Sequence, residues 1–134
     1  MQARGIHHLG LAVEDLDSAL ATYERLFDAR IEHRATVEDQ GVRAASVRIG
    51  GSRVELLEPL GEDTPVGRFL ASRGPGMHHV AYEVSDLETA LAELTSAGAD
   101  LIDERPRAGL FGLEVAFVHP DSVHGVLSEV VSGG

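Results

Sequence analysis

The chain of 134 residues contains no cysteine. This absence excludes disulfide bonds, thiolate metal sites and cysteine nucleophiles together. Any metal ion that the chain binds must therefore be held by nitrogen and oxygen ligands.

Positive charge is also scarce. The chain has no lysine, its 11 basic residues are all arginine, and its formal net charge is -11. Proteins that bind nucleic acid need a basic face, so we expect no nucleic acid partner. The same negative charge argues against binding to anionic membranes.

Long hydrophobic runs are missing as well. No apolar stretch approaches the roughly 18 residues that a bilayer-spanning helix needs. The first residues, "MQARGIHH", lack the apolar core of a signal peptide. We therefore expect no membrane partner and a cytoplasmic location. An apolar share of 43% is nevertheless enough for an ordinary globular core.

What the sequence does contain is an internal repeat. "GIHHLGLAVEDLDSALA" begins at Gly5 and "GMHHVAYEVSDLETALA" begins at Gly76, and nine of the seventeen positions are identical. Each copy opens with an alternating stretch that predicts a strand. An acidic residue, Asp15 or Asp86, then stands where it can cap a helix.

Apolar residues at helical spacing follow each cap, and Gly98 is a plausible end for the second helix. Short strand-like runs come next, at 30–37, 42–49 and 52–59 in the first copy and at 99–106, 113–120 and 124–131 in the second. The pattern predicts an α+β fold of two tandem βαβββ modules. We expect one domain, residues 1–134, with modules at about 4–62 and 76–132 and a linker at 63–75 that holds a short helix near 64–73.

The repeat extends to a glutamate in the last strand of each module. Aligning Gly51 with Gly125 also aligns Glu55 with Glu129, at an offset of 74 residues instead of 71. Longer middle loops in the second module account for the difference.

The two histidine doublets divide between the faces of their strands, because strand side chains alternate. His8 shares a face with Gly10 and Ala12, and His79 shares one with Ala81, so both are expected on a roomy face. His7 and His78 are expected on the apolar side, where they would pack.

Two histidines and two glutamates at matched positions suggest a metal site. A single strand histidine is usually a partly buried polar residue, and a single glutamate usually faces solvent. Polar groups that recur inside apolar strands are costly, however, unless they are paired or bound to metal. The candidate ligands are His8, Glu55, His79 and Glu129.

These stretches resemble the vicinal oxygen chelate (glyoxalase/bleomycin resistance/dioxygenase) superfamily, and within it the methylmalonyl-CoA epimerases. The resemblance covers nearly the whole chain and includes "VELLEPLGEDTPVGRFLASRGPGMHHVAYEV", "VEDQGV" and "FVHP" followed by "HGVLSEVV". It implies two modules around a metal site, with the same four ligands as above.

The resemblance also implies an activity, the metal-dependent epimerisation of methylmalonyl-CoA between its 2R and 2S forms. The enzyme would remove the α-proton and stabilise the enolate on a divalent metal. Nitrogen and oxygen ligands suit Co²⁺, which is our first expectation, as well as Mn²⁺, Ni²⁺, Zn²⁺ or Fe²⁺. Glu129 is a candidate base as well as a ligand.

The sequence departs from this family at several positions. Ala44 stands where some epimerases carry a glutamate base, so the second base has no assigned residue; Glu83 shares the face of His79 but is more simply a solvent-facing carboxylate. Asp121, Leu113 and Glu114 stand where basic residues are common in relatives. Other groups would then contact the CoA phosphates. The candidates are Arg68, Arg73, Arg105 and Arg107. Residues 107–112 ("RAGLFG") are expected to form a flexible loop that closes over the substrate.

Other activities of the same superfamily stay open. A glyoxalase I-like lyase or isomerase would use the same ligands on a glutathione hemithioacetal, and another metal-dependent enzyme of the superfamily is a further alternative. A ring-cleaving dioxygenase would need a site of two histidines and one carboxylate, so the fourth ligand counts against that activity. Drug-sequestering members generally lack the ligands, so the complete set counts against that role. By analogy with relatives, and because exposed sheet edges favour pairing, we expect a homodimer.

Overall fold

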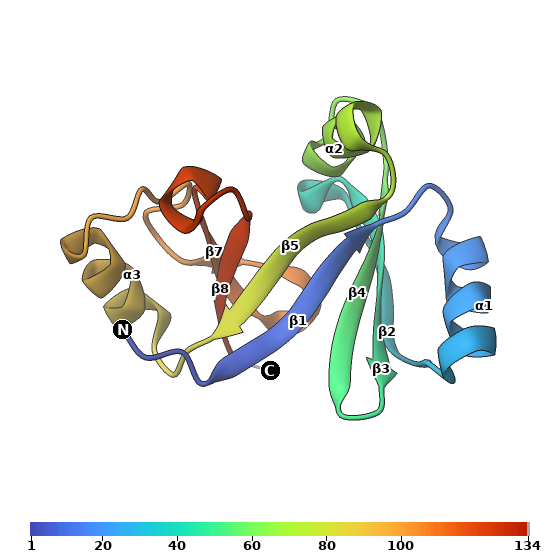
Figure 1. Ribbon diagram of the computed structural model, residues 1–134, viewed down its shortest axis with the longest axis horizontal. Helices are drawn as coiled ribbons and strands as arrows, with labels where there is room; N and C mark the ends of the chain where they lie inside the picture. Colours follow the sequence, from blue (N-terminus) through green and yellow to red (C-terminus); the bar gives the residue numbers. More distant parts are fainter. Residues whose placement is uncertain (134) are drawn as a thin grey trace. The chain divides into compact units, whose positions relative to one another are not determined.

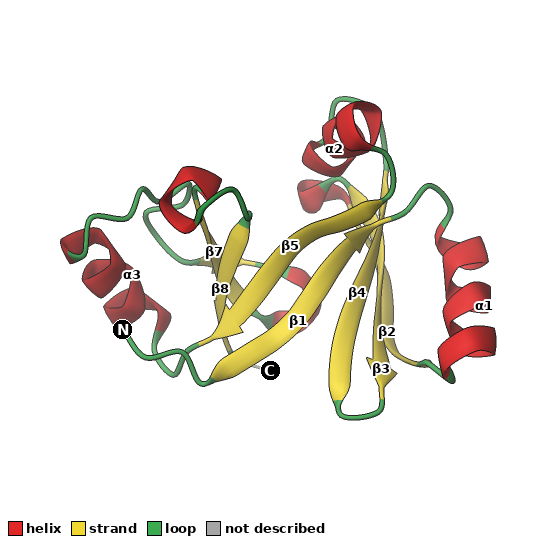
Figure 2. Cartoon of the chain, viewed as in Figure 1, coloured by secondary structure: helices red, strands yellow, loops and turns green. Residues whose placement is uncertain are grey.

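The computed structural model describes residues 1–133, in which the chain forms three α-helices and eight β-strands (Figures 1 and 2). It divides into two compact units. The N-terminal unit comprises residues 8–78, and the C-terminal unit comprises residues 1–7 together with the chain from residue 79 onward. The divisions fall directly before His8 in strand β1 and directly before His79 in strand β5.

The N-terminal unit is a sheet with strand order β2-β3-β4-β1. Strand β4 runs parallel to β1 and antiparallel to β3, which is antiparallel to β2. Its elements, in chain order, are β1 (Gly5–Ala12, from His8 onward), α1 (Leu16–Phe27), β2 (Arg30–Val37), β3 (Val42–Ile49), β4 (Ser52–Pro59) and α2 (Pro65–Arg73).

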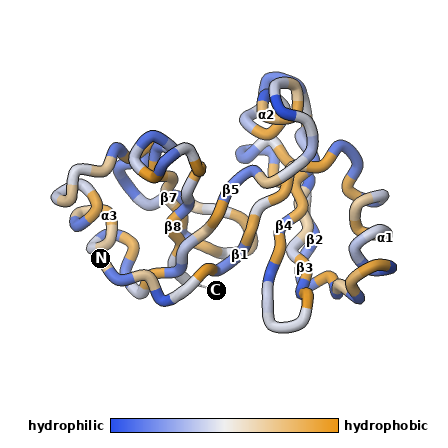
Figure 3. The backbone as a smooth tube through the Cα atoms, in the orientation of Figure 1, coloured by the Kyte–Doolittle hydropathy of each residue, from blue (hydrophilic) through white to orange (hydrophobic). Residues whose placement is uncertain are grey.

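Helix α1 packs on one face of this sheet. Leu16 and Leu20 form a buried cluster with Val47 of β3 and with Val54 and Leu56 of β4. Hydrophobic residues recur along these strands in Figure 3. The residues of β3 and β4 that alternate with this cluster are therefore turned to the opposite face, which carries Glu55.

The C-terminal unit repeats this arrangement with strand order β5-β8-β7-β6. Strand β8 is parallel to β5 and antiparallel to β7. Helix α3 packs against β7 and β8 through a buried cluster that includes Leu87, Leu91, Val118 and Val130. Its elements are β5 (Gly76–Glu83, from His79 onward), α3 (Leu87–Ser96), β6 (Arg107–Ala108), β7 (Glu114–Val118) and β8 (Ser128–Ser132).

The predicted fold class, α+β with two tandem βαβββ modules, is confirmed. That the two modules make up a single domain stays a prediction. Helix α2, at Pro65–Arg73, confirms the short helix expected in the linker.

The acidic residues expected before the two helices do precede them. The Asp15 side chain accepts a hydrogen bond from the Ser18 backbone N–H at 3.0 Å, which satisfies one of the free donors at the start of α1. Asp86 precedes α3 and accepts a hydrogen bond from the Thr89 hydroxyl at 2.7 Å. This bond lowers the pKa of Asp86.

The strand expected at 99–106 is wrong. Only an isolated bridge between Leu101 and Val118 forms there, and β6 begins later, at Arg107. The carboxylate of Asp103 accepts the Phe117 N–H at 2.9 Å and so takes the place of a backbone partner. Pro106, which has no N–H to donate, disfavours a continuous strand.

Within residues 1–133, no helix has both the length and the apolar character needed to cross a membrane.

Candidate metal centre

The two histidines of each doublet differ in burial. His8 is 1% exposed and His79 is 5% exposed, whereas His7 and His78 are only half-buried. The buried and half-buried histidines thus lie on opposite faces of each strand, as the sequence predicts. The face that carries His8, Gly10 and Ala12 is buried.

In the N-terminal unit, His8 is paired with Glu55. The Nε2 atom of His8 lies 3.3 Å from Oε1 of Glu55, and Glu55 is 2% exposed. The parallel pairing of β1 with β4 creates this contact, because it places Gly10, two residues after His8, opposite Glu55.

In the C-terminal unit, His79 is paired with Glu129 in the same way. Nε2 of His79 lies 3.5 Å from Oε1 of Glu129, which is 8% exposed. The parallel pairing of β5 with β8 places Ala81, again two residues after the histidine, opposite Glu129. The same strand register thus brings together the same two atoms in both units.

These pairs fit the donor set of a divalent metal ion. Two ligand atoms that each lie about 2.1 Å from one ion are separated by roughly 3.0–3.4 Å at the angles of octahedral or tetrahedral coordination. The distances of 3.3 and 3.5 Å are close to this range. Buried carboxylates beside imidazole nitrogens suit a borderline cation such as Co²⁺ or Zn²⁺.

An arginine-rich network lies on the face of the sheet that bears Glu55. Ser46 of β3 is the register partner of Glu55, and its hydroxyl donates to Glu32 at 3.5 Å. Arg48 and Arg53 donate to the two oxygens of Glu32 at 3.1 and 3.0 Å. Burial favours a higher pKa for Glu32, but the hydrogen bonds and charges of the two arginines outweigh it and hold the pKa below its usual value.

Phe117 adjoins the C-terminal pair and was missed by the sequence reasoning. It is the register partner of Glu129, and its ring meets the His79 ring edge to face, with centroids 5.7 Å apart and planes at 85°. The run "LEVAFVHP" predicts that Phe117 lies in a strand, but the register between β7 and β8 cannot be obtained from that run alone.

The position expected to hold a second base has no polar side chain. Ala44 is fully buried between its register partners Ala35 of β2 and Leu57 of β4. Glu83 is half-buried at the end of β5, and its backbone carbonyl accepts the Arg4 N–H at 2.7 Å.

Three of the four arginines proposed for CoA phosphates have partners within their own unit. Arg68 donates to the Asp63 carbonyl, and Arg73 lies 5.7 Å from the centre of the Phe69 ring. Arg107 pairs with Asp103 at 3.2 Å. Arg105 lines a cavity between α3 and the segment before β6, together with three glutamates. These glutamates are Glu88, Glu104 and Glu114.

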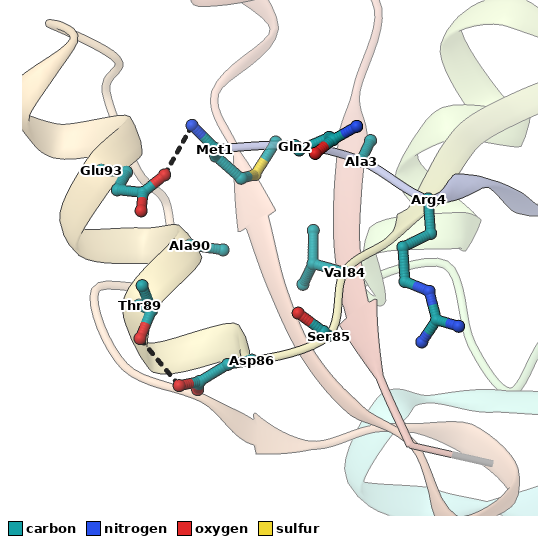
Figure 4. A pocket seen from close by; sticks show the side chains of 10 residues that line it. All are labelled: Met1, Gln2, Ala3, Arg4, Val84, Ser85, Asp86, Thr89, Ala90 and Glu93. Carbon is teal, nitrogen blue, oxygen red and sulfur yellow. Dashed lines mark hydrogen bonds and ion pairs between the residues drawn. The ribbon is translucent and has the colours of Figure 1, made fainter.

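Another cavity of the C-terminal unit, of about 310 Å³, lies between the first four residues and the start of α3 (Figure 4). The amino group of Met1 forms an ion pair with Glu93 at 2.5 Å across it, and Asp86 is directed to Thr89. Neither His79 nor Glu129 lines this cavity.

Residues 7–117 match the family described as the Glyoxalase/Bleomycin resistance protein/Dioxygenase superfamily. The chain is 38% identical to the uncharacterized protein YqjC of Bacillus subtilis over 125 residues. This match covers 93% of this chain and 89% of that protein. It is 35% identical over 127 residues to the ethylmalonyl-CoA/methylmalonyl-CoA epimerase of Cereibacter sphaeroides, covering 93% of this chain and 95% of that enzyme.

The similarity extends to solved structures. A methylmalonyl-CoA epimerase in complex with methylmalonyl-CoA and NH₄⁺ superposes with a TM-score of 0.95 at 35% sequence identity. The match covers 99% of this chain and 96% of that structure. The two chains are therefore similar in sequence as well as in fold, over nearly their full length.

Proposed function

This chain belongs to the glyoxalase/bleomycin resistance protein/dioxygenase superfamily and is a methylmalonyl-CoA epimerase-like isomerase, and we propose that it interconverts the 2R and 2S forms of methylmalonyl-CoA. The proposal rests on the similarity of the chain to these epimerases, which covers more than nine-tenths of both chains, together with one observation in this chain. That observation is the buried His–Glu pair that each unit builds in the same register.

The two pairs are proposed to hold one divalent ion, with His8, Glu55, His79 and Glu129 as its ligands. The duplication supports this assignment, because a pair that served only to pack a strand would not need the same two atoms in both copies. Burial supports it too, since a carboxylate that is 2% or 8% exposed is costly unless it is paired or bound to a cation.

A bound divalent ion supplies Lewis acidity, which stabilises charge that develops on substrate oxygens when the α-proton leaves. The α-carbon of methylmalonyl-CoA stands between a thioester and a carboxylate, so its proton is weakly acidic. Two carboxylate ligands would leave the site close to neutral, which still allows it to accept an anionic substrate.

Glu129 is proposed to accept the proton as well as to bind the ion. A carboxylate has two oxygens. Oε1 of Glu129 faces His79, and in this proposal the carboxylate accepts the α-proton of the substrate. Ala44 cannot transfer a proton, so the group that works on the opposite face of the enolate is another residue.

The finer assignments are part of the same proposal. Co²⁺ is the first ion to test, ahead of Mn²⁺, Ni²⁺, Zn²⁺ and Fe²⁺. The substrate partner is an acyl-CoA, the location is the cytoplasm, and the assembly is a homodimer, which light scattering on the purified protein would measure.

Proton exchange tests the activity directly. Co²⁺-loaded protein is incubated with methylmalonyl-CoA in D₂O, and loss of the α-proton signal is followed by NMR. We expect exchange that stops when EDTA removes the ion. A protein that leaves this signal intact but turns over a glutathione hemithioacetal is a glyoxalase-type enzyme instead.

A further inference from the structure

Phe117 is enclosed on several sides by the C-terminal unit. The carboxylate of Asp103 accepts the Phe117 N–H at 2.9 Å, and the Phe117 carbonyl accepts the N–H groups of Ile102 and Asp103 at 2.8 and 3.2 Å. The backbone of Phe117 is thus tied to the segment that precedes β6, in addition to its pairing with Glu129 in β8.

The side chain of Phe117 is covered by Arg107. The guanidinium carbon of Arg107 lies 5.7 Å from the centre of the Phe117 ring, a distance typical of a cation–π contact. Asp103 fixes this arginine with its other oxygen, because Oδ1 of Asp103 lies 3.2 Å from Nε of Arg107. One carboxylate therefore holds both the backbone of Phe117 and the cation that covers its ring.

The ring held in this way meets His79 at 85°. An edge-to-face contact restricts rotation of the imidazole about its Cβ–Cγ bond, because a turned imidazole would lose the favourable geometry or collide with the phenyl ring. Nε2 of His79 points at Glu129 in the observed orientation.

We propose that Asp103 and Arg107 are positioning residues, which hold Phe117 against His79 and so keep Nε2 of His79 directed to the ion beside Glu129. The inference rests on the proposed function in one respect, namely that His79 binds a divalent ion. Asp103, Arg107 and Phe117 are not among the proposed ligands. Groups that orient a metal-binding histidine from outside the ligand set typically change metal affinity about 10- to 100-fold.

The N-terminal unit contains a matched arrangement that provides a control. Arg73 lies 5.7 Å from the centre of the Phe69 ring, and Phe69 meets His78 with centroids 5.1 Å apart and planes at 76°. His78 is the half-buried neighbour of His79 and is not among the proposed ligands. The same Arg–Phe–His contacts thus occur once beside a ligand and once beside a histidine that is outside the set.

The test compares Phe117→Leu with Phe69→Leu, with Arg107→Gln as a milder second variant. Three quantities are measured on the full chain: the Kd for Co²⁺ by calorimetry, the visible absorption of bound Co²⁺, and Tm. We expect Phe117→Leu and Arg107→Gln to raise the Kd about 10-fold or more and to shift the absorption band. Phe69→Leu should lower Tm but leave the Kd within about twofold of wild type.

An equal change in Kd for Phe117→Leu and Phe69→Leu, or no change in either, would overturn the proposal. The NMR signals of the His79 ring in metal-free protein measure orientation independently of any ion. We expect Arg107→Gln to shift them, and unchanged signals would refute the positioning role. A wild-type protein that binds no Co²⁺, but whose His79 signals respond to Arg107→Gln, would contradict the proposed function and leave the contact itself established.

Discussion

Nε2 of His8 lies 3.3 Å from Oε1 of Glu55, and both side chains are almost completely buried. The half-buried His7 precedes it on the same strand. Because the pair is buried and matches a second pair in the other unit, we expect the buried histidine of each doublet to bind the metal and its neighbour to contribute only to packing.

The first prediction follows from this difference. Replacing His8 with Ala should weaken Co²⁺ binding by more than about 100-fold, since loss of a ligand should exceed the effect of losing a supporting group. His7→Ala is the control and should retain full stoichiometry. Metal content after dialysis and a Co²⁺ titration measure both variants. If the two variants lost metal equally, the assignment by strand parity would be wrong.

A second prediction concerns Gly67 in helix α2. A Cβ atom at this position would lie 2.1 Å from the Gly61 carbonyl oxygen, which is a backbone clash. Alanine usually stabilises a helix by about 1 kcal/mol relative to glycine. We expect the opposite sign here, a destabilisation of about 1–3 kcal/mol, the usual cost of overpacking.

Urea denaturation measures this change, and Gly51→Ala is its control. A Cβ at Gly51 meets nothing within 4 Å. The control should change the free energy of unfolding by less than about 0.5 kcal/mol. A Gly67→Ala variant as stable as wild type would show that the segment at Gly61 can move away from α2.

The third prediction is a pH dependence at Glu32. Its pKa lies below the usual value of 4.5 because Arg53 and Arg48 outweigh the opposing effect of burial. The ionised carboxylate therefore stabilises the fold above pH 4.5, and this stabilisation is lost as the pH falls through the lower pKa of the folded state.

Glu32→Gln should accordingly lower stability by up to about 1 kcal/mol at pH 7, since partly exposed ion pairs contribute little more. The difference from wild type should shrink towards zero as the solution is acidified below pH 4.5. Thermal unfolding across a pH series measures it. A difference that stayed constant with pH would mean that the effect is not due to the charge.

A fourth prediction separates the buried from the exposed leucines of α1. Leu16 is 1% exposed within the cluster that α1 forms on the sheet, so Leu16→Ala should cost about 2–5 kcal/mol. Leu26, on the same helix, is 59% exposed, and Leu26→Ala should change stability by less than about 0.5 kcal/mol. Chemical denaturation compares the two, and equal losses would contradict the observed packing.

Much of the fold could be predicted because local signals and tertiary structure agree. The run "VRAASVRI" forms β3 from Val42 to Ile49, where the sequence predicts a strand. Asp15 caps α1 where the sequence placed a cap. In such segments the period of apolar residues and the capping chemistry favour the same element.

The failures have a different physical origin. Residues 99–106 contain apolar side chains, but the Phe117 N–H bonds to the Asp103 carboxylate and not to a backbone carbonyl. The amino-acid composition of the segment does not reveal this hydrogen bond. The pairing of Phe117 with Glu129 depends on how two strands align, which is a tertiary property. The burial of His8 depends on what covers its strand face, which is also a tertiary property.

The shared register of the two His–Glu pairs limits where the chain tolerates insertions. His8 and His79 are 71 residues apart, whereas Glu55 and Glu129 are 74 apart, so the second module has accepted extra residues outside the paired strands. A single residue inserted within β4, between Val54 and Glu55, would turn the glutamate to the face that packs on α1. Length variation among homologous chains should therefore be confined to the loops, and β4 and β8 should keep a constant spacing to their glutamates.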